Sequence, residues 1–199
     1  MSRLTDEQLL KLYRSGRTQA FAHLVLRYKQ ELFHFLVRFV GSPEAAEDVF
    51  QDTFLQLHLS AHTFDTSRPL KPWLFAIGAN KARDYLRMSS RRGAAPLSAP
   101  LGSVGEGGRR YVDLLEAKLD LPEQEYERRE TEEQVAEVLA RLPDHQREVL
   151  LLTYFHRFTY KETAQVLRVP LGTVKSRLHA SVAAFAWAWK QQYGQALED

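Results

Sequence analysis

The sequence has no cysteine among its 199 residues. Disulfide bonds and zinc sites with thiolate ligands are therefore excluded, and a reducing compartment suits the chain. The sequence also has no run of about eighteen apolar residues, which a membrane-spanning helix needs, and no apolar core of a signal peptide near its start. We therefore expect a soluble, cytoplasmic protein that does not insert into a membrane.

A strong net charge is also missing, because 27 basic and 25 acidic side chains leave a formal charge of +2. The chain is not a histone-like polycation, so any affinity for nucleic acid has to come from local patches. Hydrophobic residues make up 44% of the sequence, which is enough to build cores and argues against a disordered chain.

Helical periodicity runs through almost every segment, and no segment shows the sustained alternation of a strand. Thr5 with Gln8, Thr18 and Ser42 have the position and chemistry of helix N-caps. The helices expected in the N-terminal half span residues 5–16, 18–41, 42–61 and about 72–92.

The composition changes after this half, because residues 93–110 consist mainly of Gly, Ala, Ser and Pro. Such a segment predicts a flexible linker, and the residues that follow it are acidic. Helix resumes near Pro122 and breaks at Leu142-Pro143. We expect an all-α protein with two small helical domains, 1–92 and 122–199, joined by a flexible, partly acidic linker at 93–121.

The most informative stretch is TYKETAQVLRVPLGTVKSRLHA, residues 159–180, which predicts a helix-turn-helix. Thr159 and Glu162 have the spacing of a capping box, and Val169-Pro170 ends the first helix. The second helix has an apolar face with Leu171, Val174, Leu178, Val182 and Phe185. Its polar side chains suit phosphates and base edges, and they are Thr173, Lys175, Ser176, Arg177 and His179. An ordinary pair of amphipathic helices is the alternative.

A second polar strip follows the last helix of the N-terminal half, where residues recur by threes and fours. It combines an aromatic ring, an amide, a carboxylate and guanidinium groups, a mixture that suits single-stranded nucleic acid better than a protein core. The strip consists of Trp73, Ile77, Asn80, Asp84, Arg87 and Arg91, with Arg83 beside it. A solvated helix face with a partly buried tryptophan is the alternative.

The helix at residues 42–61 has an acidic face that would repel DNA, so a basic protein partner is the better expectation. This face carries Glu44, Asp48, Gln51, Asp52 and Gln56. A solvated face without a partner remains the alternative.

Two motif sets, one in each half, resemble those of extracytoplasmic-function (ECF) sigma factors, a compact class of bacterial transcription initiation factors. The N-terminal resemblance covers about residues 7–92 and is most specific in AAEDVFQDTFLQLH and KPWLFAIGANKARDYLR. The C-terminal resemblance covers about residues 132–187, through LARLPDHQREVLLLTYFHRFTYKETAQVL and VPLGTVKSRLHAS. The order of the two motif sets and the chain length favour membership of this class.

The resemblance implies an alternative sigma factor that binds core RNA polymerase and promoter DNA. The acidic face would dock on the polymerase, and residues 63–71 with the polar strip would hold the melted non-template strand of the −10 element. The strip residues implied are Trp73, Asn80, Arg83, Asp84, Arg87 and Arg91. The helix-turn-helix would bind the −35 element as duplex. The class also implies an anti-sigma factor as partner, which can hold the protein at the membrane, and no catalytic residue, cofactor or metal.

Three residues depart from the family pattern. Arg168 occupies the turn where glycine is frequent, Thr163 replaces an aliphatic residue, and Ala180 replaces a frequent arginine. The rival function is a helix-turn-helix regulator that acts on duplex DNA without being a polymerase subunit. An enzyme is less well supported, because only His58 and His62 are paired at helical spacing and no third metal ligand accompanies them.

Overall fold

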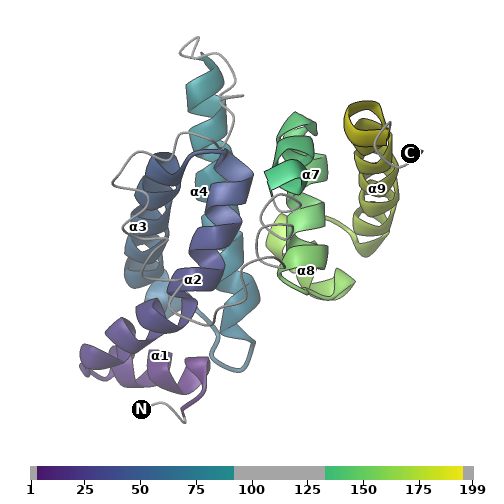
Figure 1. Ribbon diagram of the computed structural model, residues 1–199. Coiled ribbons are helices and arrows are strands. Elements are labelled where there is room, and N and C mark those ends of the chain that lie inside the picture. The colour runs from purple at the N-terminus through teal and green to yellow at the C-terminus, as the bar shows by residue number, and fades with distance from the viewer. Residues whose placement is uncertain (1–3, 92–132, 195–199) are drawn as a thin grey trace, which may run out of the picture.

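The computed structural model describes residues 4–91 and 133–194, and every regular element in these two ranges is helical (Figure 1). The N-terminal half contains α1 (Asp6–Arg14), α2 (Gln19–Val40), α3 (Pro43–Ser60), the 3₁₀ turn η1 (Ala61–Thr63) and α4 (Leu70–Arg91). The C-terminal half contains helical residues 133–141, α7 (Asp144–Leu150), the π-helical turn η2 (Leu151–Phe155), α8 (Tyr160–Leu167) and α9 (Leu171–Tyr193).

The all-α prediction is thereby confirmed for the described residues. The predicted linker at 93–121 and the start of the predicted domain 122–199 lie outside these residues. Among the helices that the structure describes, none has the length and apolar character needed to cross a membrane.

The core of the N-terminal half is built by apolar side chains of α2, α3 and α4, among which Leu32, Leu57 and Leu74 are completely buried. α4 approaches its neighbours closely at Gly78. A Cβ atom at this position would lie 3.1 Å from Leu32 Cδ1 on α2 and 3.6 Å from the hydroxyl oxygen of Thr53 on α3. The glycine therefore allows α4 to pack into the groove between the other two helices.

The predicted helix caps have different outcomes in this half. The capping box of Thr5 with Gln8 is present, and the hydroxyl of Ser42 accepts a hydrogen bond from Ala45 N at 3.2 Å. The prediction for Thr18 is wrong, because its own backbone is helical and its side chain makes no capping bond. α4 begins at Leu70, two residues before Pro72, since proline is tolerated within a first helical turn.

The helix-turn-helix of the C-terminal half is formed by α8 and α9. The capping box of Thr159 with Glu162 is present, and α8 ends at Arg168 in the left-handed conformation (φ 53°, ψ 46°). An arginine thus takes the backbone angles that glycine adopts without strain.

The buried stripe of α9 differs from the predicted one. Val174, Leu178 and Ser181 are buried, whereas the predicted Leu171 and Val182 are 37% and 41% exposed. The hydroxyl of Ser181 donates to the carbonyl of Arg177 at 2.7 Å, which allows a polar residue to lie in this contact. The side of α9 that is buried is the one that packs against the rest of the C-terminal half, and this side includes only some of the apolar residues of the helix.

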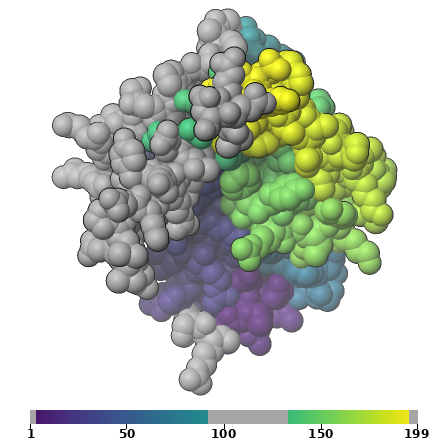
Figure 2. Space-filling model, turned by 45° about the vertical axis from the view of Figure 1, so that its right-hand side comes forward, coloured from purple at the N-terminus to yellow at the C-terminus, as the bar shows by residue number. Residues whose placement is uncertain are grey.

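The two halves pack against each other, with η2 and α8 beside α2 and α4 (Figures 1 and 2). The buried ring of His156 lies 5.6 Å from the ring of Phe35 and 5.5 Å from that of Phe75. Phe158 packs edge-on against Phe75 at 4.9 Å, and the ammonium group of Lys71 lies 5.0 Å from the Phe158 ring. The contact between the halves therefore contains a cluster of aromatic side chains.

Candidate nucleic-acid and polymerase interfaces

The strip on α4 is only partly exposed. Asp84, Arg87 and Arg91 are exposed, whereas Ile77, which was predicted in the strip, is only 9% exposed and belongs to the core. Trp73 is half-buried and stacks on the Phe64 ring with centroids 4.4 Å apart and planes at 24°. The tryptophan therefore supports the preceding loop, and only part of its ring remains available to a ligand.

Four of the polar residues named with this strip are already paired with one another. The Arg83 guanidinium donates to Asn80 Oδ1, and Arg87 forms an ion pair with Asp84. Arg83 also lies 3.5 Å from a carboxylate oxygen of Glu148 on α7, in the C-terminal half. Nucleic acid that bound Asn80 and Arg83 would have to replace these contacts.

Glu148 is buried beneath this contact. Burial raises the pKa of its carboxyl group to about 7, although Arg83 and Arg177 oppose the rise. On the same helix, Arg147 is also buried and donates to Asp144 Oδ1 at 2.7 Å. The contact between α4 and α7 thus contains a carboxyl group that gains or loses its charge near neutral pH.

The loop between α3 and α4 presents polar side chains above a buried anchor. Phe64 is buried, whereas Thr63, Asp65 and Ser67 are exposed. The Asp65 carboxylate accepts hydrogen bonds from the backbone N–H of Ser67 at 2.9 Å and from its hydroxyl at 2.8 Å. Both bonds lower the pKa of the Asp65 carboxyl group, and the bond from the backbone has the larger effect. The turn therefore carries a stable negative charge.

The acidic face of α3 is on the surface, as its helical spacing predicts. Glu44, Asp48, Gln51 and Asp52 are exposed, and Gln56 is half-buried. The sequence analysis missed Leu55 and Leu59, which follow the acidic residues along this face and are 56% and 66% exposed. The sequence could have revealed them, because the spacing of four residues continues from Gln51 to Leu55 and Leu59.

The predicted duplex-reading residues occupy the first three turns of α9. Lys175, Ser176 and His179 are exposed, whereas Thr173 and Arg177 are half-buried. The Ser176 hydroxyl donates to the carbonyl of Thr173 at 3.1 Å, which leaves its lone pairs free. The structure thus brings these residues together at the accessible start of the second helix of the motif.

The histidine pair His58 and His62 was considered as a metal site in the sequence. Nδ1 of His58 is hydrogen-bonded to the hydroxyl of Tyr13. The described residues contain no group of three or more His, Cys, Asp or Glu side chains that could hold a metal ion.

Comparison with known proteins covers both halves. Residues 24–92 match the family model of sigma-70 region 2, and residues 132–184 match that of sigma-70 region 4. The RNA polymerase sigma-H factor of Pseudomonas aeruginosa is 30% identical over 174 residues, which cover 87% of this chain and 88% of that protein. The ECF RNA polymerase sigma factor SigW of Bacillus subtilis is 29% identical, with 85% and 89% covered.

The solved structure of CnrH in complex with the cytosolic domain of CnrY resembles this one with a TM-score of 0.63. It shows 26% sequence identity, and the match covers 91% of this chain and 94% of that chain. Since relatives match along nearly their whole length and the two family models fall on the two helical halves, the chain belongs to the sigma-70 family and is an alternative sigma factor of the ECF group.

Proposed function

We propose that this sigma factor divides promoter recognition between its two halves and docks on core RNA polymerase through α3. The observation that supports this most directly is the position of the two family matches, one on each half, each carrying an exposed polar surface. The chain needs no catalytic residue and no cofactor for this task, because the polymerase performs the chemistry. We place the protein in the cytoplasm, where that enzyme acts.

The docking surface consists of the acidic face of α3 with Leu55 and Leu59. Carboxylates repel DNA and attract basic groups of a protein. Exposed leucines beside them favour a protein partner against which their apolar surface can be buried. Both properties fit a basic, partly apolar surface of the polymerase.

The loop at residues 61–69, which overlaps the predicted segment 63–71, and the exposed part of α4 are assigned to the single strand of the −10 element. Arg87 and Arg91 can neutralise phosphates, while the accessible part of the Trp73 ring and the amide of Asn80 can meet an unstacked base. α9 is assigned to the −35 duplex, because an exposed helix start with short polar and basic side chains suits the major groove.

Binding both elements requires the two halves to separate. The −10 and −35 elements are about 25 base pairs apart, as their names state. This distance is about 85 Å at a rise of about 3.4 Å per base pair. In the structure, however, α4 and α8 are in contact. The 42 peptide steps from residue 91 to residue 133 allow a reach of up to about 140 Å, so the chain can span this distance.

An anti-sigma factor is the proposed regulatory partner. CnrH has been solved in complex with the cytosolic domain of CnrY, and this chain resembles CnrH over most of its length. A partner that covers the exposed face of α3 would prevent docking on the polymerase.

The test is assembly of the full chain with bacterial core RNA polymerase, measured by co-elution in size-exclusion chromatography. We expect the parent to co-elute and a chain with both Asp48→Arg and Asp52→Arg to lose binding by at least about tenfold, since two attractive charges become repulsive. Glu133→Arg reverses an exposed charge in the other half and should bind like the parent. A folded parent that binds duplex DNA but not the polymerase would instead indicate a conventional regulator.

A further inference from the structure

α1 holds the beginning of the loop that we assign to the −10 strand. Arg14, in the last turn of α1, points its guanidinium group at η1. Its Nε donates to the carbonyl oxygen of Ala61 at 2.7 Å, and its Nη2 donates to the carbonyls of Ala61 and Phe64. One planar group therefore fixes two backbone carbonyls, three residues apart, just before the exposed part of the loop.

α1 also holds the end of the same loop. The Glu7 carboxylate accepts a hydrogen bond from the backbone N–H of Leu70, the first residue of α4, at 2.9 Å. Burial opposes the charge of Glu7, but the hydrogen bonds from Leu70 and from its own backbone outweigh it and lower the pKa. The negative charge also lies at the positive end of α4, which strengthens the contact.

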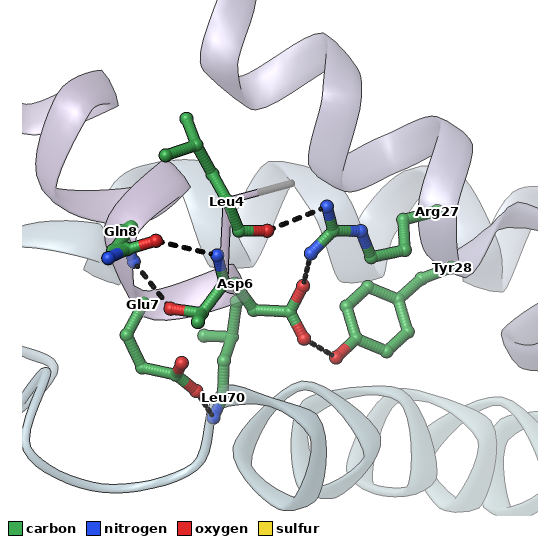
Figure 3. A network of polar contacts seen from close by, with 8 residues as sticks. Leu4, Asp6, Glu7, Gln8, Arg27, Tyr28 and Leu70 are labelled. Carbon is green, nitrogen blue, oxygen red and sulfur yellow. Dashed lines mark hydrogen bonds and ion pairs between the residues drawn. The ribbon is translucent and has the colours of Figure 1, made fainter. Parts of the chain in front are cut away.

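α1 is itself bonded to α2 at its N-terminal end. Figure 3 shows the Asp6 carboxylate between Arg27 and Tyr28 of α2, with Arg27 also donating to the carbonyl of Leu4 at 2.9 Å. Burial, reinforced by the nearby Asp6, raises the pKa of Tyr28, so its hydroxyl stays protonated and continues to donate. The same view shows Glu7 reaching the backbone of Leu70.

The loop also has contacts that do not involve α1. The Asp65–Ser67 turn orders its tip, the stacking of Phe64 on Trp73 holds one point, and the burial of Ala61 and Leu70 anchors its two ends beside α3 and α4. None of these contacts engages the backbone carbonyls that Arg14 holds, so Arg14 and Glu7 orient the backbone at the two ends. Discrimination between bases requires donors and acceptors at fixed positions, because a mobile loop can adjust to any base.

We infer that α1 determines how strictly the −10 strand is read, with Arg14 as the positioning residue and Glu7 as its counterpart at the other loop end. This inference rests on the proposed role of residues 61–69. Arg14 acts through the loop backbone, because its guanidinium is engaged by Ala61 and Phe64. Loss of Arg14 should therefore reduce base preference more than it reduces overall affinity.

The experiment uses the full chain assembled with core RNA polymerase and a pool of single strands randomised across the −10 positions. Bound strands are sequenced, and base preference is expressed as the ratio of best to worst base at each position. We expect Arg14→Ala to lower the largest ratio about tenfold. Arg14→Lys should lie between Arg14→Ala and the parent, because an ammonium group offers no planar fork.

Two controls separate positioning from general damage. Arg17→Ala removes an equal charge from an exposed position just after α1 and should keep the parent's preferences. Thermal unfolding and polymerase binding, measured on every variant, report whether the fold is intact. If Arg14→Ala does not assemble, Glu7→Gln, which keeps an acceptor for Leu70 N, is compared with Glu7→Ala, and only the second should lose preference.

Unchanged ratios in an assembled Arg14→Ala holoenzyme, or in Glu7→Ala, would overturn the inference. Equal losses in Arg14→Ala and Arg17→Ala would also overturn it, since surface charge alone would explain them. A parent holoenzyme without base preference at any position would instead refute the proposed role of the loop.

Discussion

Thr163 is completely buried in α8, and its hydroxyl oxygen has no hydrogen-bond partner among the described residues. A buried hydroxyl without a partner costs about 1–3 kcal/mol. Valine has nearly the same shape and no polar atom. We therefore predict that Thr163→Val raises the free energy of unfolding by about 1 kcal/mol, measured by urea denaturation.

Thr53 provides the matched control. It is also fully buried in a helix, but its hydroxyl donates to the carbonyl of Val49 at 2.6 Å. Thr53→Val removes a made hydrogen bond and should bring no gain. Equal stabilisation by both substitutions would show that the extra methyl group, and not the unpaired hydroxyl, is responsible.

Arg168 shows how far sequence can predict strain at a single residue. With arginine in place of the frequent glycine, this turn has either to differ from the usual one or to accept strain. The structure has the strained form, with φ at 53°, a conformation that costs a residue other than glycine about 1–2 kcal/mol. The choice between the two depends on how α8 packs, which local sequence does not report.

At the scale of helices, local signals predicted most of the fold. The caps at Thr5, Ser42 and Thr159 were identified because cap and first turn are adjacent in the sequence. The side of a helix that becomes buried depends on its neighbours, and Ile77 and Val182 were therefore misplaced. The exposed polar residues of α3 and the start of α9 were predicted better, because their spacing alone brings them together.

α9 has room for a further phosphate contact at Ala180. This residue is exposed and follows Thr173 and Ser176 along one side of the helix. We predict that Ala180→Arg strengthens binding to duplex DNA and steepens the dependence of log K on log salt concentration by about 0.9, the value for one added phosphate contact. Binding is measured by fluorescence anisotropy over a range of salt.

The comparison variant for this prediction is Ala186→Arg. It adds the same charge to an exposed position six residues later, on a different side of α9. Its salt dependence should stay close to that of the parent. A matching increase in both variants would show that net charge, and not this side of α9, controls the binding.

The largest feature that the sequence did not reveal is the contact between the halves. Arg83 and Glu148 meet although 65 residues separate them. Across the same boundary, the carboxylate of Glu31, which also pairs with Lys71 of its own half, lies 3.7 Å from Nδ1 of His156. No local pattern predicts which residues of the two halves will meet, because each surface is equally plausible as a solvated one.

The pKa of Glu148 makes this contact dependent on pH. Its carboxyl group holds a proton up to a pH of about 7 in the closed arrangement, whereas an exposed glutamate loses it near pH 4.5. Closing therefore takes up a proton between these values, and the closed arrangement loses stability as pH rises from about 5 to about 7. We predict a growing fraction of separated halves over this window.

The measurement is energy transfer between dyes on Glu47→Cys and Ala183→Cys, both at exposed positions of a chain without native cysteine. Glu148→Gln should abolish the part of the pH dependence that belongs to this carboxyl group. The groups that face Glu148 are Arg83 of α4, Arg177 of α9, and Asp144 and Arg147 of α7. An unchanged pH profile in Glu148→Gln would assign the effect to other groups.

The arrangement of the C-terminal half depends on the number of residues in the π-helical turn η2. The backbone N–H of His156 bonds to the carbonyl of Leu151, five residues earlier, so this turn holds more chain than an α-helical one. Removing one codon there would rotate everything that follows by about 100° relative to α7. His156 and Phe158 would then leave the aromatic contact between the halves. The length of this turn therefore specifies how the halves meet, as much as the chemistry of its side chains does.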